Sequence, residues 1–73
     1  MTEYGVILFY TTSSAMRAEK LLVAEGCSVK LIPVPRHLSS DCGVALRFNW
    51  QQQEKVKSVL DQAQVEVDAI HQL

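Results

Sequence analysis

The sequence has only two cysteines and three glycines among 73 residues, no long apolar segment and no excess of basic residues. Two cysteines are too few for a disulfide scaffold, so we expect free thiols and a reducing cytoplasmic location. No apolar run approaches the roughly 20 residues that span a bilayer, so we expect no membrane association. The first residues, Met1, Thr2 and Glu3, lack the basic region of a secretory signal.

Charge and length set further limits. Seven Lys and Arg against eight Asp and Glu give a net charge of −1. Nucleic-acid binding proteins usually carry a basic excess or a basic patch, so we expect no nucleic-acid partner. A chain of 73 residues is long enough for one domain only, so we assign residues 1–73 to a single domain with a small core.

Several catalytic motifs are also absent. There is no G-x-S-x-G nucleophile elbow and no glycine-rich phosphate loop. The residues able to bind a metal show neither C-x-x-C nor H-x-x-x-H spacing, so we expect no metal and no cofactor. These residues are Cys27, His37, Asp41, Cys42 and His71.

The pattern of apolar residues predicts six elements. Residues 4–10, 29–32, 43–48 and 65–69 show the composition or alternation of strands. A helix is predicted between the "TTSS" segment and Gly26, a typical residue after a helix end. Asn49 should cap a second helix, with Gln52 in the capping-box position.

The predicted order β-α-β-β-α-β is typical of an α+β ferredoxin-like sandwich, with a four-stranded antiparallel sheet and two helices on one face. In this topology the first helix begins at the same end of the domain as the loop between the second and third strands. Thr12, Ser13 and Ser14 at that helix start offer N–H groups and partial positive charge to an anion.

That loop, "PVPRHLSSDCG" over residues 33–43, contains both prolines and one cysteine. It is longer than the usual hairpin loop of about two to five residues, and long ordered loops often carry function. Arg36 and His37 would favour a reactive thiolate at Cys42, whereas Asp41 would oppose it. A cysteine is also often an inert small hydrophobic residue, so both interpretations stay open.

Cys27 follows Gly26 and begins the second strand, where a buried structural residue is expected. It is separated from the loop by about 20 Å of strand, too far for a disulfide with Cys42.

The first strand is apolar on both faces, but the helices cover only one. We therefore expect the open face of the sheet to bind a partner, most simply a second copy in a homodimer. Arg47 in the third strand should point to that open face.

The segments "LIPVPRHLSSDCGVALRF" and "SSAMRAEKLLVAEG" together resemble the DUF3343 family of selenium/sulfur carrier-like proteins. The family pattern is similar to P-x-P-R-x-[ILV]-S-S-x-C-G followed by a short apolar strand, and the resemblance covers residues 4–70.

The resemblance implies that Cys42 is a carrier thiol that accepts sulfur or selenium from a donor protein and passes it to an acceptor protein. This role is closer to that of a carrier than of an enzyme. The loop residues implied to support the thiol are Pro33, Pro35, Arg36, Ser39, Ser40 and Gly43. Two alternatives stay open: a non-catalytic interaction module with a structural Cys42, and a thiol-dependent redox or metal sensor.

Overall fold

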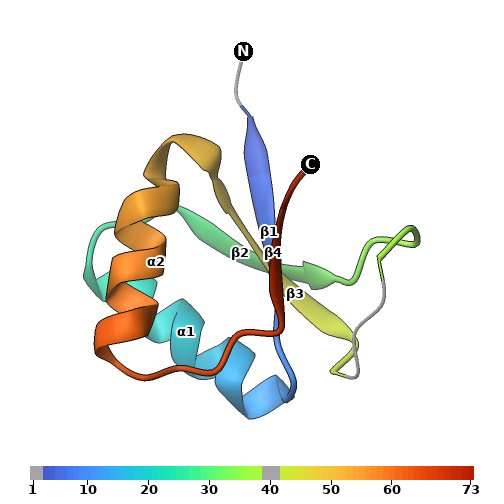
Figure 1. Ribbon diagram of the computed structural model, residues 1–73, viewed down its shortest axis with the longest axis horizontal. Coiled ribbons are helices and arrows are strands. Elements are labelled where there is room, and N and C mark those ends of the chain that lie inside the picture. Colours follow the sequence, from blue (N-terminus) through green and yellow to red (C-terminus); the bar gives the residue numbers. More distant parts are fainter. Residues whose placement is uncertain (1–2, 39–41) are drawn as a thin grey trace.

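The computed structural model describes residues 3–38 and 42–73, and Figure 1 shows these residues as one sheet with both helices on the same face. The strands form a four-stranded sheet in the order β2-β3-β1-β4, and all neighbouring strands are antiparallel. The elements are β1 (Tyr4–Leu8), α1 (Thr12–Ala24), β2 (Val29–Pro33), β3 (Val44–Asn49), a 3-10 turn η1 (Trp50–Gln52), α2 (Gln53–Gln62) and β4 (Ala69–Gln72). The predicted ferredoxin-like α+β fold is confirmed.

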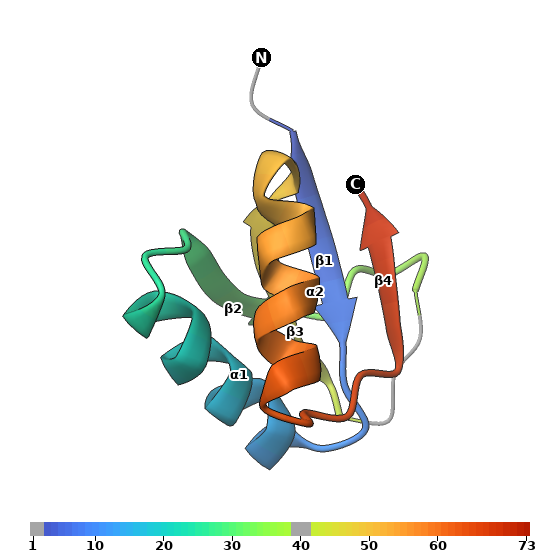
Figure 2. The same cartoon turned by 60° about the vertical axis from the view of Figure 1, so that its left-hand side comes forward.

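The main core lies between the sheet and the two helices, which pack side by side over it in Figure 2. Ile7 and Phe9 of the first strand segment are fully buried there, together with Leu22 of α1 and Val56 of α2. Trp50 packs against this core with its ring 5.8 Å from that of Phe48.

The opposite face of β1 is buried as well. Val6 and Leu8 form a second cluster with Ala45, and each is at most 2% exposed. Val34 and Leu38, from the loop between β2 and β3, pack against this cluster. Figure 1 shows the loop on the side of the sheet away from the helices. The chain itself therefore covers the apolar patch that we expected to be open. The homodimer stays a prediction, and this patch no longer supports it.

The last strand begins later than the sequence predicted. Residues 65–69 were expected to form it, but β4 begins at Ala69. The Val65 N–H donates to the carbonyl of Leu60, which makes Val65 part of the helix end, and the Asp68 N–H donates to Leu8. As a consequence, His71 belongs to the sheet and pairs with Val6.

The predicted capping box is also wrong. Asn49 Oδ1 accepts from the Gln51 N–H at 3.1 Å and so caps the 3-10 turn that precedes α2. Gln52 Oε1 does not return to Asn49; it accepts from the Ser28 N–H at 3.2 Å. The side chain thus joins the start of α2 to the turn before β2.

Neither α1 nor α2, the α-helices in the described part of the chain, is long and apolar enough to cross a membrane. Both end in the same way, with a residue in the left-handed region whose N–H bonds back into the last turn. In α1 this residue is Gly26, with φ of 80°, as predicted. In α2 it is Gln64, with φ of 56°, a conformation that is unfavourable for a residue with a Cβ.

We expect Gln64→Gly to raise the free energy of unfolding by about 0.5–1 kcal/mol, because glycine adopts the left-handed conformation without a steric penalty. Urea denaturation followed by circular dichroism would measure the change. Gln62→Gly is the matched control, since Gln62 is also exposed but lies within α2, and it should lose about 0.5–1 kcal/mol. Equal effects of the two substitutions would contradict the interpretation.

Candidate functional site

Cys42 lies just before β3, at the end of the loop that covers the second face of the sheet. Its side chain is half-buried and packs against the helix-side core, not against the Val6 cluster. Between the two ends of the loop, the Val34 N–H donates to the Gly43 carbonyl at 3.4 Å and extends the β2–β3 ladder by one bond. The loop therefore leaves the sheet on one side and returns with its thiol toward the other.

The thiol bonds to the backbone of Val44. Cys42 Sγ donates to the Val44 carbonyl at 2.8 Å, and the Val44 N–H points back to Sγ at 3.4 Å. The first of these bonds requires a protonated thiol, because a thiolate has no proton to donate. Ionisation of Cys42 therefore requires its sulfur to turn away from the Val44 carbonyl, whereas the Val44 N–H can serve either form.

Gly43 makes this geometry accessible. Its φ of 76° is in the left-handed region, so the chain reverses within one residue of Cys42. A Cβ at this position would meet nothing within 4 Å. Glycine is therefore required at this position because of the backbone conformation, and not because a Cβ would lack space.

The start of α1 lies beside the thiol loop, as the topology predicted. Thr12 Oγ1 donates a long hydrogen bond, 3.4 Å, to the Cys42 carbonyl. The N-cap of the helix is Thr11, which the sequence did not single out: its Oγ1 accepts from the Ser14 N–H at 3.1 Å. The N–H group of Ser14 already donates to the Thr11 side chain. The N–H groups of Thr12 and Ser13, in the same first turn, have no acceptor within the helix.

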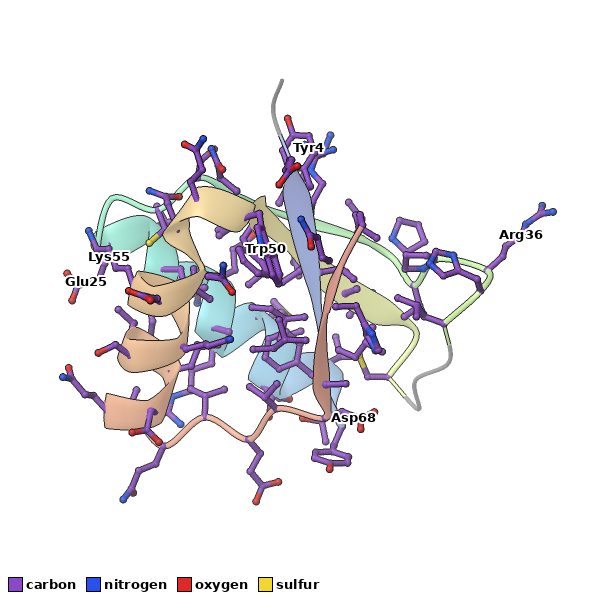
Figure 3. The ribbon with its side chains drawn as sticks, turned by 45° about the horizontal axis from the view of Figure 1, so that its top comes forward. Tyr4, Glu25, Arg36, Trp50, Lys55 and Asp68 are labelled. Atoms are coloured by element: carbon purple, nitrogen blue, oxygen red, sulfur yellow. The ribbon has the colours of Figure 1, made fainter. Side chains whose placement is uncertain are left out.

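Arg36, which was expected to support the thiol, lies away from it (Figure 3). Arg36 is exposed and extends into solvent on the side opposite the helices (Figure 3). It belongs to a turn in which the Leu38 N–H donates to the Pro35 carbonyl at 2.9 Å. Pro33 ends β2, an edge strand, where its missing N–H is tolerated. The predicted site residues Ser39 and Ser40 lie outside the described residues, as does Asp41.

Cys27 is a core residue, 5% exposed, and its N–H donates to the Leu22 carbonyl at 2.9 Å. The prediction of a structural role is confirmed by this burial. Neither cysteine takes part in a disulfide. Within residues 3–38 and 42–73, no three His, Cys, Asp or Glu side chains gather as a possible metal site.

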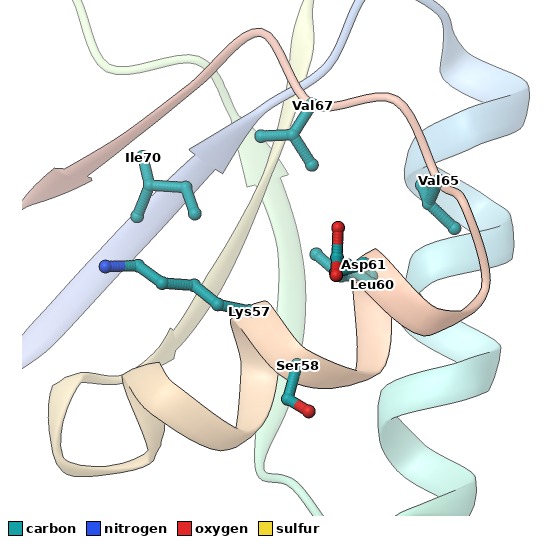
Figure 4. Close-up of a pocket in the computed structure, with 7 residues that line it drawn as sticks. All are labelled: Lys57, Ser58, Leu60, Asp61, Val65, Val67 and Ile70. Atoms are coloured by element: carbon teal, nitrogen blue, oxygen red, sulfur yellow. The ribbon is translucent and has the colours of Figure 1, made fainter.

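A groove of about 480 Å³ lies between α2 and β4 and has a largely apolar lining. Figure 4 shows Lys57 extended along the side of the groove where Ile70 lies. The residues that line it are Lys57, Ser58, Leu60, Asp61, Val65, Val67 and Ile70. None of the predicted site residues that the structure describes contributes to it, so the groove is separate from Cys42 and the start of α1.

The comparison with protein families matches residues 4–72, almost the whole chain, to the family described as "Putative Se/S carrier protein-like". The chain belongs to this family, and the resemblance seen in the sequence is confirmed. No curated protein and no solved structure matches the chain.

We expect Gly43→Ala to lower the free energy of unfolding by about 1–2 kcal/mol, because a Cβ makes the left-handed conformation unfavourable. Gly43→Asn is the matched variant, and it should lose less, since asparagine tolerates this region better than alanine. Urea denaturation measures both. A loss for Gly43→Asn as large as that for Gly43→Ala would contradict an origin in backbone conformation.

Proposed function

We propose that the protein is a sulfur or selenium carrier whose Cys42 thiol holds the transferred atom. Two observations support this proposal: the family match over residues 4–72, and the position of a half-buried thiol at the end of a long loop beside a helix start. The other cysteine, Cys27, is buried in the core and has no comparable access. The geometry around Cys42 carries the proposal.

Transfer would begin with the Cys42 thiolate attacking the outer sulfur of a persulfide on a donor protein. A new S–S bond forms to Cys42, the S–S bond of the donor breaks, and the donor leaves as a thiolate. The proton of the outer sulfur stays with it, so no external oxidant or reductant is needed. The same attack on selenium bound to a donor sulfur would load selenium. In the second step a nucleophile of the acceptor attacks the outer atom and releases the Cys42 thiolate.

The surroundings of Cys42 suit an anion that forms during transfer. When the thiol loses its proton, it loses its bond to the Val44 carbonyl but keeps access to the Val44 N–H. The start of α1 is close to the Cys42 backbone, because Thr12 Oγ1 donates to the Cys42 carbonyl, and it would offer the N–H groups of Thr12 and Ser13 and its partial positive charge to the anion. These donors would replace the guanidinium of Arg36, which extends away from the thiol.

The carrier would work with a donor and an acceptor protein in a reducing compartment such as the cytoplasm, where an unloaded thiol stays free. Its own contribution is to hold the atom and present it. The proposal requires no metal and no cofactor.

A second function has one observation in its favour. The two contacts between Cys42 Sγ and Val44 could serve to fix the loop, as in an interaction module that uses its loop for recognition. In that case Cys42→Ala would keep partner binding and lower the stability by about 1–3 kcal/mol. This module would not carry sulfur.

Mass spectrometry of the intact protein after incubation with a cysteine desulfurase and cysteine tests the carrier proposal. We expect the wild-type protein to gain the mass of one sulfur atom, because the accessible thiol accepts the sulfane sulfur. Cys42→Ser should gain none, and Cys27→Ala, in which the carrier thiol is intact, should gain as much as wild type.

Two results would overturn the carrier proposal. One is a gain of sulfur by Cys42→Ser. The other is a wild-type protein that is never loaded while its Cys42 reacts with iodoacetamide no faster than free cysteine. The second result, together with a loss of stability in Cys42→Ala, would favour the interaction module.

A further inference from the structure

On the face of the sheet away from the helices, three basic side chains lie in one row with Val6, which is buried in the second cluster. The strand register places Lys30 of β2 opposite Arg47 of β3, Arg47 opposite Val6 of β1, and Val6 opposite His71 of β4. All four side chains point away from the helices, because their neighbours along each strand pack in the helix-side core. At about 4.8 Å between strands, the row is about 14 Å long.

The pair of Lys30 and Arg47 is unfavourable for the isolated protein. Like charges directly opposite each other on neighbouring strands destabilise a sheet. No acidic residue relieves this repulsion from within the sheet, since the four strands contain no Asp or Glu. A like-charge cross-strand pair with no acidic residue in the strands around it points to an anion supplied from outside.

The row is held in place. Arg47 is half-buried, and its guanidinium lies 4.3 Å from the centre of the Tyr4 ring, a cation–π contact that keeps it flat against the strand. Lys30 and His71 are exposed at either end. The loop that packs on the same face carries two further exposed side chains of this kind, Arg36 and His37.

We propose that this face docks an extended acidic segment of a partner protein. An extended chain with carboxylates on alternate residues presents them on one side at about 6.6–6.8 Å intervals, so that two or three carboxylates span the row. Binding would neutralise the Lys30–Arg47 pair. The surface is distinct from the thiol, which packs on the other side of the sheet. It is therefore a site for recognition and not for chemistry.

Two other occupants fit less well. A two-fold dimer through this face would bring the basic row against its own copy, with repulsion between like charges. A long nucleic acid would extend past the row, and the chain as a whole offers no excess of basic residues to hold it, since seven Lys and Arg stand against eight Asp and Glu.

Titration of the ¹⁵N-labelled protein with a capped peptide of alternating glutamate and valine tests the proposal. We expect shifts of the backbone amides of Lys30, Arg47 and His71, and no such shifts with the peptide in which glutamine replaces glutamate. Lys30→Glu should weaken binding about tenfold. The same substitution should raise the melting temperature, because it replaces a like-charge pair with an opposite-charge pair.

Lys55→Glu is the matched control: it makes the same charge change at an exposed position on the helix layer (Figure 3). It should leave binding within about twofold of wild type, since it lies on the other face. The proposal is overturned if the glutamine peptide binds equally well, or if Lys55→Glu weakens binding as much as Lys30→Glu. Tighter binding of a single-stranded oligonucleotide of equal charge, or self-association through this face in sedimentation, would also overturn it. The assay uses no sulfur donor, so its outcome is independent of the carrier proposal.

Discussion

Burial of the central strand β1 on both of its faces is the constraint on which the rest of the structure depends. Ile7 and Phe9 require the helices, whereas Val6 and Leu8 require a cover on the opposite side. Each such side chain contributes about 1.5–3 kcal/mol when it is removed from water, a large share of the stability of a domain this small. The loop between β2 and β3 supplies the second cover, which explains why it is much longer than a hairpin turn requires.

The position of the thiol follows from the path of this loop. Val34 and Leu38 pack over the second face, and Gly43, with its left-handed conformation, leads the chain into the start of β3. Cys42 consequently arrives at the end of the β1–β3 pairing, where the chain also begins α1. Stability and site are thus served by the same segment: one half of the loop covers apolar surface, and its end presents the sulfur.

The sequence was sufficient for the fold, but not for the contacts that surround Cys42. Alternation and helix-end signals predict the element order, because these patterns are local. The start of β4 was missed because Val65 alternates like a strand residue yet completes the end of α2. Arg36 was expected near the thiol because it is close in sequence, but it extends into solvent on the side opposite the helices (Figure 3), whereas the Cys42 side chain packs against the helix-side core. Nothing local reveals that Val34 and Leu38 cover Val6 and Leu8, since that contact depends on the tertiary path of the loop.

The covering role of the loop has a consequence for protein engineering. Two-residue turns are the commonest hairpin connections, and a shortened variant would replace this loop with such a turn. Here such a replacement would leave aliphatic side chains of a central strand open to water on a flat, antiparallel surface, which is the kind of surface that promotes aggregation. Variants with a shortened loop would therefore require polar substitutions on that side of β1 to remain soluble. In this sense the length of the connection contributes to the solubility of the molecule.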